Sequence, residues 1–315
     1  MSELAPPVIA IAGPTAAGKT QLALALCERF DRPGRRWRGA EIISVDSAQV
    51  YRGMDIGTAK PDPATRLRIP HHLVDILDPA ESYSAARFAA DAATAIAAIQ
   101  ARGRAAILVG GTMLYFRALL EGLSVLPSAD ADVRARIAAF ADGQGWAAVH
   151  AHLAERDPQT AARLHPNDAQ RIARALEIIE LTGQPLSAAY AAVQSPVWSG
   201  PVQRWIVCPP QRDILHQRIE QRFMQMINDG LVDEVAALRE RPDLNLELPS
   251  MRAVGYRQIW QYLDGMGSLD DAIQRGIAAT RRYAKRQLTW LRSETEWTWL
   301  DGPDIDEVVR LTADL

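Results

Sequence analysis

The 315-residue sequence contains two cysteines, Cys27 and Cys208, which are too few to hold a fold together through a disulfide framework. We expect both thiols to be small buried groups in a protein of a reducing compartment. The sequence also lacks an uncharged apolar run of about 18 residues, which disfavours a membrane span. Residues 1–7 lack the charged start and apolar core of a signal peptide. These absences predict a cytoplasmic protein without a membrane partner.

The chain has no overall excess of positive charge, because its formal net charge is −3. A nucleic-acid site would therefore have to be a local basic patch. Hydrophobic residues make up 48% and charged residues 23% of the sequence, as in ordinary folded proteins. The length is sufficient for one large α/β domain and a smaller second one.

The most informative stretch is residues 13–20, GPTAAGKT, which match the phosphate-loop pattern G-x-x-x-x-G-K-[ST]. The apolar run 8–12 predicts a buried strand before it. A helix after it is predicted by an apolar stripe that reaches toward Phe30 and consists of Leu22, Leu24, Ala25 and Leu26. Backbone N–H groups at such a helix N-terminus bind anions. We expect Lys19 to reach a terminal phosphate and the Thr20 hydroxyl to ligate Mg²⁺. The correct flanking pattern disfavours a chance glycine turn.

Patterns along the rest of the chain predict an α/β fold, with a P-loop-type parallel sheet flanked by helices and an all-helical insertion. Strands are predicted over residues 8–12, 41–45, 72–77, 105–109 and 204–208. A long helix that ends at Ala101 is predicted to be capped by Ser82 or Ser84. Further helices are predicted over 113–121, 133–140, 146–156, 169–182, 213–228, 232–239 and 270–292. Because residues 127–200 carry no convincing strand, we assign them to the insertion, and residues 1–126 and 201–315 to the catalytic core.

A single carboxylate is well placed to act beside the phosphate loop. Asp46 follows the second predicted strand, and ligands of open α/β sheets bind at the carboxyl ends of strands. Kinases and nucleotide hydrolases normally carry a second acid at a strand end, but the strand 105–109 is followed by Gly110, Gly111 and Thr112. Asp46 could therefore serve the metal of a kinase-like enzyme or accept a proton from a nucleophile. The structural alternative is an aspartate that caps a turn.

The second informative region is residues 252–292, which contain eight Lys or Arg and three acids. In the last predicted helix, Arg281/Lys285 and Arg282/Arg286 are like-charge pairs at i,i+4, which is unfavourable without an anion nearby. A solvated surface is the usual explanation, but we favour a site for a phosphate backbone. The aromatic residues of this region could stack on unpaired bases; they are Tyr256, Tyr283 and Trp290. For Trp290, packing in the core is an equally good explanation.

Two further groups of arginines allow alternative interpretations. Arg218 and Arg222 are one helical turn apart and could bracket a pyrophosphate. They could equally pair with Glu220 and Asp229. A smaller basic cluster in the insertion consists of Arg163, Arg171 and Arg174.

Six motifs, in order along nearly the whole chain, resemble those of the tRNA dimethylallyltransferases, the bacterial tRNA isopentenyltransferases. They occupy residues 13–20, 46–61, 110–115, 170–177, 252–258 and 285–292. The second of them, DSAQVYRGMDIGTAKP, is highly specific. The resemblance implies transfer of the dimethylallyl group from its diphosphate to N6 of the adenosine that is 3′-adjacent to the tRNA anticodon.

The resemblance also implies how the donor is held. The phosphate loop would bind the pyrophosphate leaving group with Mg²⁺ and without ATP hydrolysis, which explains the missing second acid. Lys19, Thr20 and Arg222 would neutralise the charge that grows on the pyrophosphate. The implied diphosphate-binding residues are Gly13, Pro14, Thr15, Ala16, Ala17, Gly18, Lys19, Thr20, Arg218 and Arg222, with Thr20 as the metal ligand.

On the acceptor side, Asp46 would accept the proton of the adenine N6 amino group, with Thr112 beside it, so the implied catalytic residues are Asp46, Thr112, Lys19 and Arg222. The adenine would be flipped into a channel. The helical insertion would clamp the anticodon stem-loop of a tRNA bound by a monomer. The implied tRNA contacts are Asp46, Ser47, Ala48, Gln49, Thr112, Arg134, Gln170, Arg171, Arg174, Arg252, Gly255, Tyr256, Arg257, Lys285, Arg286, Gln287 and Arg292.

Two other functions are compatible with parts of this pattern. A small-molecule or nucleotide kinase would need ATP and an acceptor pocket but no basic helix. An RNA-binding switch would use a nucleotide only to control its shape.

Overall fold

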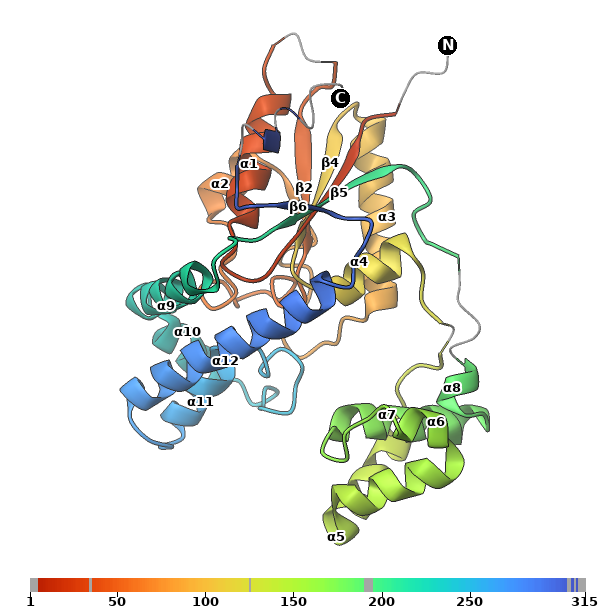
Figure 1. Cartoon of the computed structure of the whole chain (residues 1–315). Helices are drawn as coiled ribbons and strands as arrows, with labels where there is room; N and C mark the ends of the chain where they lie inside the picture. The colour runs from red at the N-terminus through yellow and green to blue at the C-terminus, as the bar shows by residue number, and fades with distance from the viewer. Residues whose placement is uncertain are drawn as a thin grey trace. The chain divides into compact units, whose positions relative to one another are not determined.

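The computed structural model describes residues 5–33, 36–124, 126–189, 195–304, 307–308 and 310. The chain divides into two compact units. The first combines Met1–Leu120 with Val197–Leu315, and the second is Glu121–Pro196 (Figure 1). The insertion assigned from the sequence, 127–200, starts and ends a few residues later than this second unit.

The first unit is built on a parallel sheet, and its described residues form six strands in the order β3-β2-β4-β1-β5-β6. This architecture confirms the predicted fold class. The central strands β1, β2 and β4 are buried along their whole length, as expected where helices cover both faces of a parallel sheet. The strands are β1 (Val8–Ala12), β2 (Ala40–Val45), β3 (His71–His72), β4 (Ala105–Gly110), β5 (Val202–Val207) and β6 (Thr298–Leu300).

Helices α1 and α3 lie on opposite sides of the sheet (Figure 1). Of the two predicted cap residues, Ser82 and Ser84, it is Ser84 that caps α3: its side chain accepts a hydrogen bond from the Arg87 N–H at 3.1 Å. Leu22, Leu26 and Phe30 of α1 pack with the strands in one hydrophobic core. Four helices alternate with the strands in the N-terminal part of the chain: α1 (Lys19–Phe30), α2 (Pro63–Arg68), α3 (Ala85–Ala101) and α4 (Met113–Leu120).

A group of four helices completes the first unit: α9 (Arg212–Asn228), α10 (Leu231–Arg239), α11 (Tyr256–Leu263) and α12 (Leu269–Leu291). Helices α9 and α12 pack closely at Gly276, where a Cβ atom would lie 2.2 Å from Cζ of Phe223. A second core beneath α10 and α11 includes Tyr51, Met54 and Tyr256. This core attaches the motif that follows β2 to the helices.

The second unit consists, within its described residues, of helices: α5 (Ala131–Arg156), α6 (Pro158–Ala161), α7 (Ala169–Thr182) and α8 (Leu186–Ala189). The prediction of separate helices over 133–140 and 146–156 corresponds to α5, whose backbone is non-helical at Gly145 (φ 79°, ψ 157°). The unit has its own hydrophobic core, which includes Ile137, Leu153 and Ile172. Each helix in the described ranges is too short or too polar to cross a lipid bilayer.

The predicted third strand, 72–77, is wrong beyond His72. Only His71 and His72 pair with β2, and the chain then turns through left-handed backbone conformations at Leu73 (φ 61°) and Asp75 (φ 58°). The Asp75 carboxylate accepts a hydrogen bond from the Lys60 ammonium at 2.5 Å. This buried ion pair favours a turn where the apolar pattern favours a strand. The short helix α11 and the strand β6 were not predicted.

Candidate active site

The phosphate loop connects β1 to α1, as its sequence pattern predicts. Gly18, at the N-cap of α1, has a left-handed φ of 101°, and no side chain caps the first turn of the helix. The backbone N–H groups of this turn and the helix dipole are therefore available to an anion. Ala16 also has a positive φ, 63°, which is uncommon for a residue with a side chain.

Two cations meet at this loop. The Lys19 ammonium donates a hydrogen bond to the Pro14 carbonyl at 2.7 Å. Burial and then the nearby Arg222 guanidinium lower the pKa of Lys19 from 10.5 to about 8, although Asp46 acts in the opposite direction. Burial also lowers the pKa of Arg222. Two positive charges that are both partly desolvated form a site with a strong preference for an anion.

A cavity of about 480 Å³ lies between the loop and α9. It is lined by loop residues 16–21 and by Arg218, Gln221, Arg222 and Gln225 of α9, so none of its described lining residues is acidic. The Arg218 guanidinium also donates a hydrogen bond to the Ala17 carbonyl at 3.5 Å. A diphosphate would fit the charge of this surface.

The alternative pairing of Arg218 and Arg222 with Glu220 and Asp229 is not observed. Glu220 instead forms a 2.7 Å ion pair with Arg281 of α12. Asp229 accepts a hydrogen bond from Gln225 at 2.7 Å. Both arginines thus remain directed at the phosphate loop.

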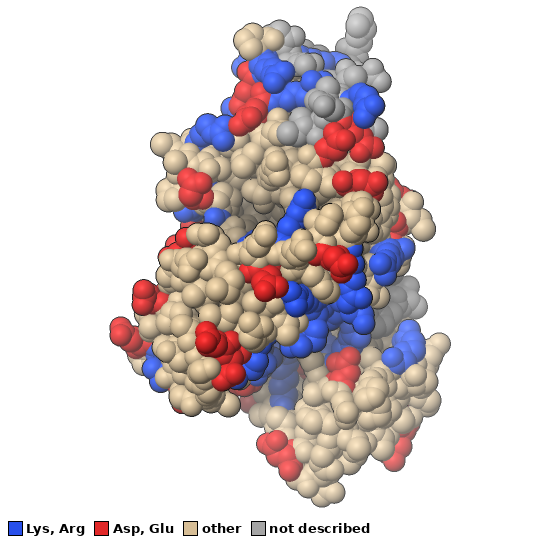
Figure 2. All heavy atoms as spheres, turned by 60° about the vertical axis from the view of Figure 1, so that its left-hand side comes forward, with Lys and Arg blue, Asp and Glu red and all other residues tan. Residues whose placement is uncertain are grey.

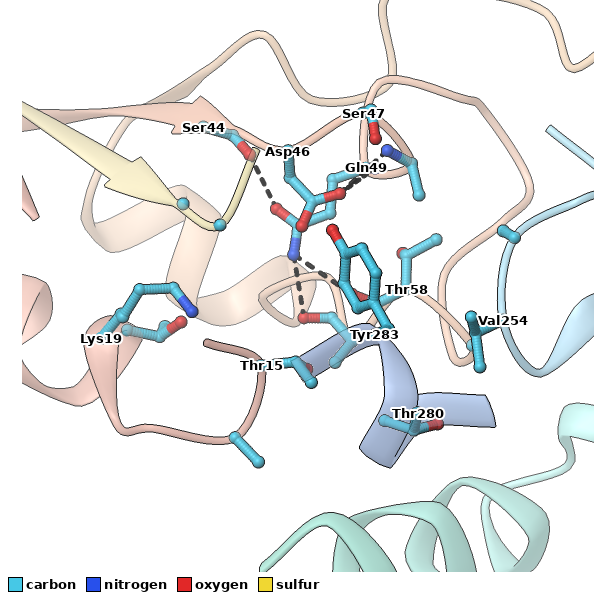
Figure 3. Close-up of a pocket in the computed structure, with 18 of the residues that line it drawn as sticks. Thr15, Lys19, Ser44, Asp46, Ser47, Gln49, Thr58, Val254, Thr280 and Tyr283 are labelled. Carbon is cyan, nitrogen blue, oxygen red and sulfur yellow. Dashed lines mark hydrogen bonds between the residues drawn. The ribbon is translucent and has the colours of Figure 1, made fainter. Parts of the chain in front are cut away.

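Asp46 directly follows β2 and is held by its own turn (Figure 3). Its Oδ1 accepts hydrogen bonds from the N–H of Ala48 at 2.8 Å and of Gln49 at 3.3 Å. One carboxylate oxygen of Asp46, Oδ1, therefore caps a turn, which was the structural alternative considered from the sequence. No hydrogen bond from the described residues reaches Oδ2. The turn fixes the carboxylate and leaves one oxygen for another partner.

Thr112 lies beside Asp46 at the end of β4. Its Oγ1 accepts a hydrogen bond from the Ser47 N–H at 3.2 Å, and its own N–H donates to the Val45 carbonyl at 3.3 Å. The neighbouring strands β2 and β4 therefore bring Thr112 and the Asp46 turn together. The threonine hydroxyl supports the backbone on which the carboxylate is mounted.

A second cavity, of about 380 Å³, brings these parts together. Its lining includes Lys19 and Thr20 from the loop, Asp46 from the end of β2, and Arg222 from α9. In Figure 3 the phosphate loop and the Asp46 turn approach this cavity from opposite sides. Both cavities have Lys19, Thr20 and Arg222 in their linings, so an anion held by the loop would border the space in front of Asp46.

Tyr283 of α12 also lines the cavity near Asp46, although the sequence suggested only that it could stack on a base. Burial, followed by the negative charge of Asp46, raises the pKa of the Tyr283 phenol. The Arg286 guanidinium lies 5.7 Å from the centre of the Tyr283 ring. The helical spacing of Thr280, Tyr283 and Gln287 could have indicated that these three residues share one face.

The motif after β2 is held by two residues that sequence reasoning missed. The Glu234 carboxylate of α10 accepts hydrogen bonds from the N–H groups of Asp55, Ile56 and Gly57 at 2.8, 2.7 and 3.1 Å. Lys60, whose side chain is 2% exposed, forms ion pairs with Asp55 at 2.7 Å and Asp75 at 2.5 Å. The specific sequence of residues 46–61 thus encodes a rigid loop as well as the carboxylate of Asp46.

Gln49 belongs to the same network. Its side chain accepts a hydrogen bond from the Ser44 hydroxyl at 2.8 Å and donates to the carbonyls of Thr58 and Ala59 at 3.2 and 3.3 Å. This amide therefore links β2 to the end of the motif (Figure 3). Ser47, Ala48 and Gln49 all line the 380 Å³ cavity.

The outer side of α12 is basic. Arg281 is paired with Glu220, but Lys285 and Arg286 are exposed, and neither forms an ion pair with a described residue. Arg292, at the C-cap of α12, is exposed as well. Figure 2 shows a face of the molecule on which Lys and Arg side chains gather in one region, with acidic side chains scattered around it.

Some residues assigned to tRNA binding do not present their side chains to solvent. Tyr256 is fully buried and donates a hydrogen bond to Glu234 at 2.6 Å. Gly255, the N-cap of α11, and Gln287 are buried too. Arg257 and Arg252 are both exposed, and Arg252 forms a 2.5 Å surface ion pair with Glu247.

The remaining assigned contacts belong to the second unit. Arg134 and Arg174 both form ion pairs with the buried carboxylate of Glu177, at 2.8 and 2.6 Å. They therefore compensate an internal charge, which also keeps the pKa of Glu177 below its usual value despite burial. Gln170 and Arg171, at the start of α7, are exposed.

The site can be compared with known proteins. A family model described as IPP transferase matches residues 49–294. The chain belongs to this family. It is 56% identical to the tRNA dimethylallyltransferase of Halorhodospira halophila, over 98% of this chain and 93% of that protein.

Solved structures of the family agree with the fold. The full-length tRNA isopentenylpyrophosphate transferase of Bacillus halodurans is 40% identical, with a TM-score of 0.68 over 98% of this chain and 96% of that one. A eukaryotic dimethylallyltransferase described as acting on tRNA is 27% identical, with a TM-score of 0.74 over 98% of this chain and 77% of that one.

Proposed function

We propose that this protein transfers a dimethylallyl group from dimethylallyl diphosphate to N6 of the adenosine 3′-adjacent to the anticodon of tRNA, releasing diphosphate. The observation that carries the proposal is one cavity that brings together an anion-binding loop, two partly desolvated cations and a fixed carboxylate. The names of its relatives support the same reaction.

The phosphate loop would hold the diphosphate of the donor. Lys19, Arg218 and Arg222 supply positive charge, and the first turn of α1 supplies N–H groups. When the allylic C1–O bond breaks, its electron pair remains on the diphosphate. Charged donors that are already desolvated stabilise this leaving group without further reorganisation.

Asp46 would act on the acceptor. The N6 lone pair of the adenine forms the new N–C1 bond, and the nitrogen then releases a proton to the carboxylate. The Oδ2 of Asp46 is suited to receive it because Oδ1 is engaged by Ala48 and Gln49. Thr112 would keep the carboxylate in position through the Ser47 N–H.

The donor set also fits Mg²⁺. No cluster of three or more His, Cys, Asp or Glu side chains occurs among the residues that the structure describes. Mg²⁺, however, commonly binds through one or two protein oxygens together with substrate phosphates. The Thr20 hydroxyl lines the same cavity as Lys19 and Arg222 and would supply such an oxygen. When bound, the ion would neutralise part of the diphosphate charge.

The RNA must deliver its base to this cavity. Because an adenine stacked in an RNA loop cannot reach a carboxylate that lines a cavity, we infer that the base is flipped out. The exposed Lys285, Arg286, Arg292 and Arg257 would bind the RNA backbone, and Gln170 and Arg171 of the second unit would clamp the anticodon stem-loop. The protein would act as a monomer in the cytoplasm.

A label-transfer assay tests the reaction. The protein is incubated with Mg²⁺, labelled dimethylallyl diphosphate and tRNA lacking the modification, without ATP. We expect label in the RNA from the wild-type protein. Asp46→Asn should reduce turnover by about 10²- to 10⁴-fold, because it removes the base but retains an oxygen for the turn. The exposed Asp233→Asn serves as the matched control.

Other outcomes identify the alternatives. Label transfer only when ATP is supplied, or no label transfer at all, would count against the proposed reaction, and tRNA binding without transfer would favour an RNA-binding switch. An Asp46→Asn variant with most of its turnover would remove this carboxylate from the chemistry.

A further inference from the structure

Gln287 is the one buried polar side chain of α12, a helix whose residues are all described; it is 7% exposed. It follows two exposed basic residues, Lys285 and Arg286, and it lines the 380 Å³ cavity together with Arg286. A buried amide is costly unless its polar atoms have partners, so its contacts indicate its role.

Both ends of this amide are bonded to the backbone of the site. Oε1 accepts a hydrogen bond from the Thr15 N–H at 2.9 Å. Nε2 donates a hydrogen bond to the Gly111 carbonyl at 2.9 Å. The side chain therefore bridges the phosphate loop and the turn after β4.

The packing around the bridge leaves no space for a larger neighbour. A Cβ atom added to Gly111 would lie 2.2 Å from Nε2 of Gln287 and 3.1 Å from the Gly13 carbonyl oxygen. Gly111 is thus matched to the amide by its lack of a side chain. The next residue is Thr112, whose hydroxyl accepts the Ser47 N–H beside Asp46.

We propose that Gln287 is a positioning residue that fixes the phosphate loop and the Thr112 turn to α12. The inference rests on the proposed function, since it deepens the account of that site. Through Thr15 the amide orients the loop that holds the diphosphate, and through Gly111 it orients the residue that supports Asp46. In this way α12, whose outer surface is basic, keeps the diphosphate-binding loop and the Asp46 turn at a fixed distance from each other.

This role differs from the tRNA contact that the motif suggested. An amide with both ends engaged in protein hydrogen bonds has little left to offer RNA. We therefore expect substitution to affect donor binding and turnover while tRNA affinity is preserved.

The test compares Gln287→Met, which keeps the shape and loses both hydrogen bonds, with Gln287→Glu, which keeps only the acceptor. Gln274→Met, at an exposed position of the same helix, is the matched control. Calorimetry measures the affinity for inorganic diphosphate with Mg²⁺, and kinetics measure kcat and KM for dimethylallyl diphosphate. We expect both Gln287 variants to lose about tenfold or more in diphosphate affinity and in kcat. Their tRNA dissociation constants should stay within about twofold of the wild-type value.

Hydrogen exchange in the wild-type protein provides a measurement that does not depend on how the variants fold. The Thr15 amide should be protected, and rapid exchange would overturn the proposal. Wild-type diphosphate affinity and kcat in Gln287→Met would also overturn it, as would a loss confined to tRNA binding. Diphosphate binding and hydrogen exchange need no turnover, so they remain informative if the wild-type protein fails to transfer the prenyl group.

Discussion

The phenol of Tyr256 donates a 2.6 Å hydrogen bond to the carboxylate of Glu234, deep beneath the loop that follows Asp46. The same carboxylate accepts three backbone N–H groups from residues 55–57. Burial and this negative charge raise the pKa of Tyr256, so the phenol stays a donor. Gly57 is required because a Cβ atom there would lie 2.4 Å from the Tyr256 ring.

Glu234→Gln should therefore loosen the loop. An amide NH₂ group would face donors where the carboxylate now accepts, which would leave backbone N–H groups of residues 55–57 without partners. We expect a loss of about 2 kcal/mol in the free energy of unfolding, measured by urea denaturation. Tyr256→Phe should cost about 1 kcal/mol, and the exposed Glu240→Gln should be neutral. Equal stability of Glu234→Gln and wild type would refute this role.

Diphosphate binding should depend on the ionisation of Lys19. Because the pKa of Lys19 is lowered to about 8, the cation is fully present below that pH and is lost above it. The affinity of the wild-type protein for inorganic diphosphate should fall as the pH rises through about 8. The Lys19→Met variant is measured over the same pH range, because its affinity changes only with the ionisation of the ligand and so corrects for it. Parallel pH profiles for the two proteins would contradict this assignment.

The same shift predicts the sign of a stability effect. The unfolded chain holds the Lys19 proton up to the ordinary pKa of 10.5, whereas the folded protein releases it near 8. The unfolded state therefore binds more protons in this interval, so the Lys19 contribution to the free energy of unfolding rises with pH across it. Lys19→Met should remove that part of the pH dependence.

Replacing Lys285 and Arg286 together by Ala should weaken tRNA binding and reduce its salt dependence. Each phosphate contact contributes about 0.7 to 0.9 to the slope of log K against log salt, so the slope should fall by between about 1.4 and 1.8. The control replaces Arg68 and Arg87, which are 55% and 51% exposed and lie outside the basic face of α12. An unchanged slope would show that Lys285 and Arg286 do not contact RNA phosphates and that the outer surface of α12 is only solvated.

Two glycines in helices should respond in opposite directions to Ala. Gly276→Ala would place a methyl group 2.2 Å from the Phe223 ring and should destabilise the protein by about 1 to 3 kcal/mol. At Gly143, in α5, a Cβ atom would have no other atom within 4 Å, so Gly143→Ala should stabilise its helix by up to about 1 kcal/mol. Thermal denaturation monitored by circular dichroism measures both changes.

Local features of the sequence determined two parts of the site, the phosphate loop and the Asp46 turn. The phosphate loop lies between an apolar strand and a helix because its glycines and the flanking apolar patterns act over a few residues. Asp46 follows a buried strand, and its turn is formed by its own side chain and the next N–H groups. Such short-range interactions can be recognised without knowing the fold.

Tertiary structure decided which side chains meet. The pattern over 72–77 favours a strand, yet the Lys60–Asp75 ion pair holds a turn there. The like-charge run of α12 is relieved at Arg281 by Glu220, which lies 61 positions away in the chain. Gln287 matched an RNA-contact motif, but packing directs its amide to Thr15 and Gly111. These partners are distant in sequence, and hydrogen bonds and ion pairs of this kind exist only once the sheet and the helices have packed together.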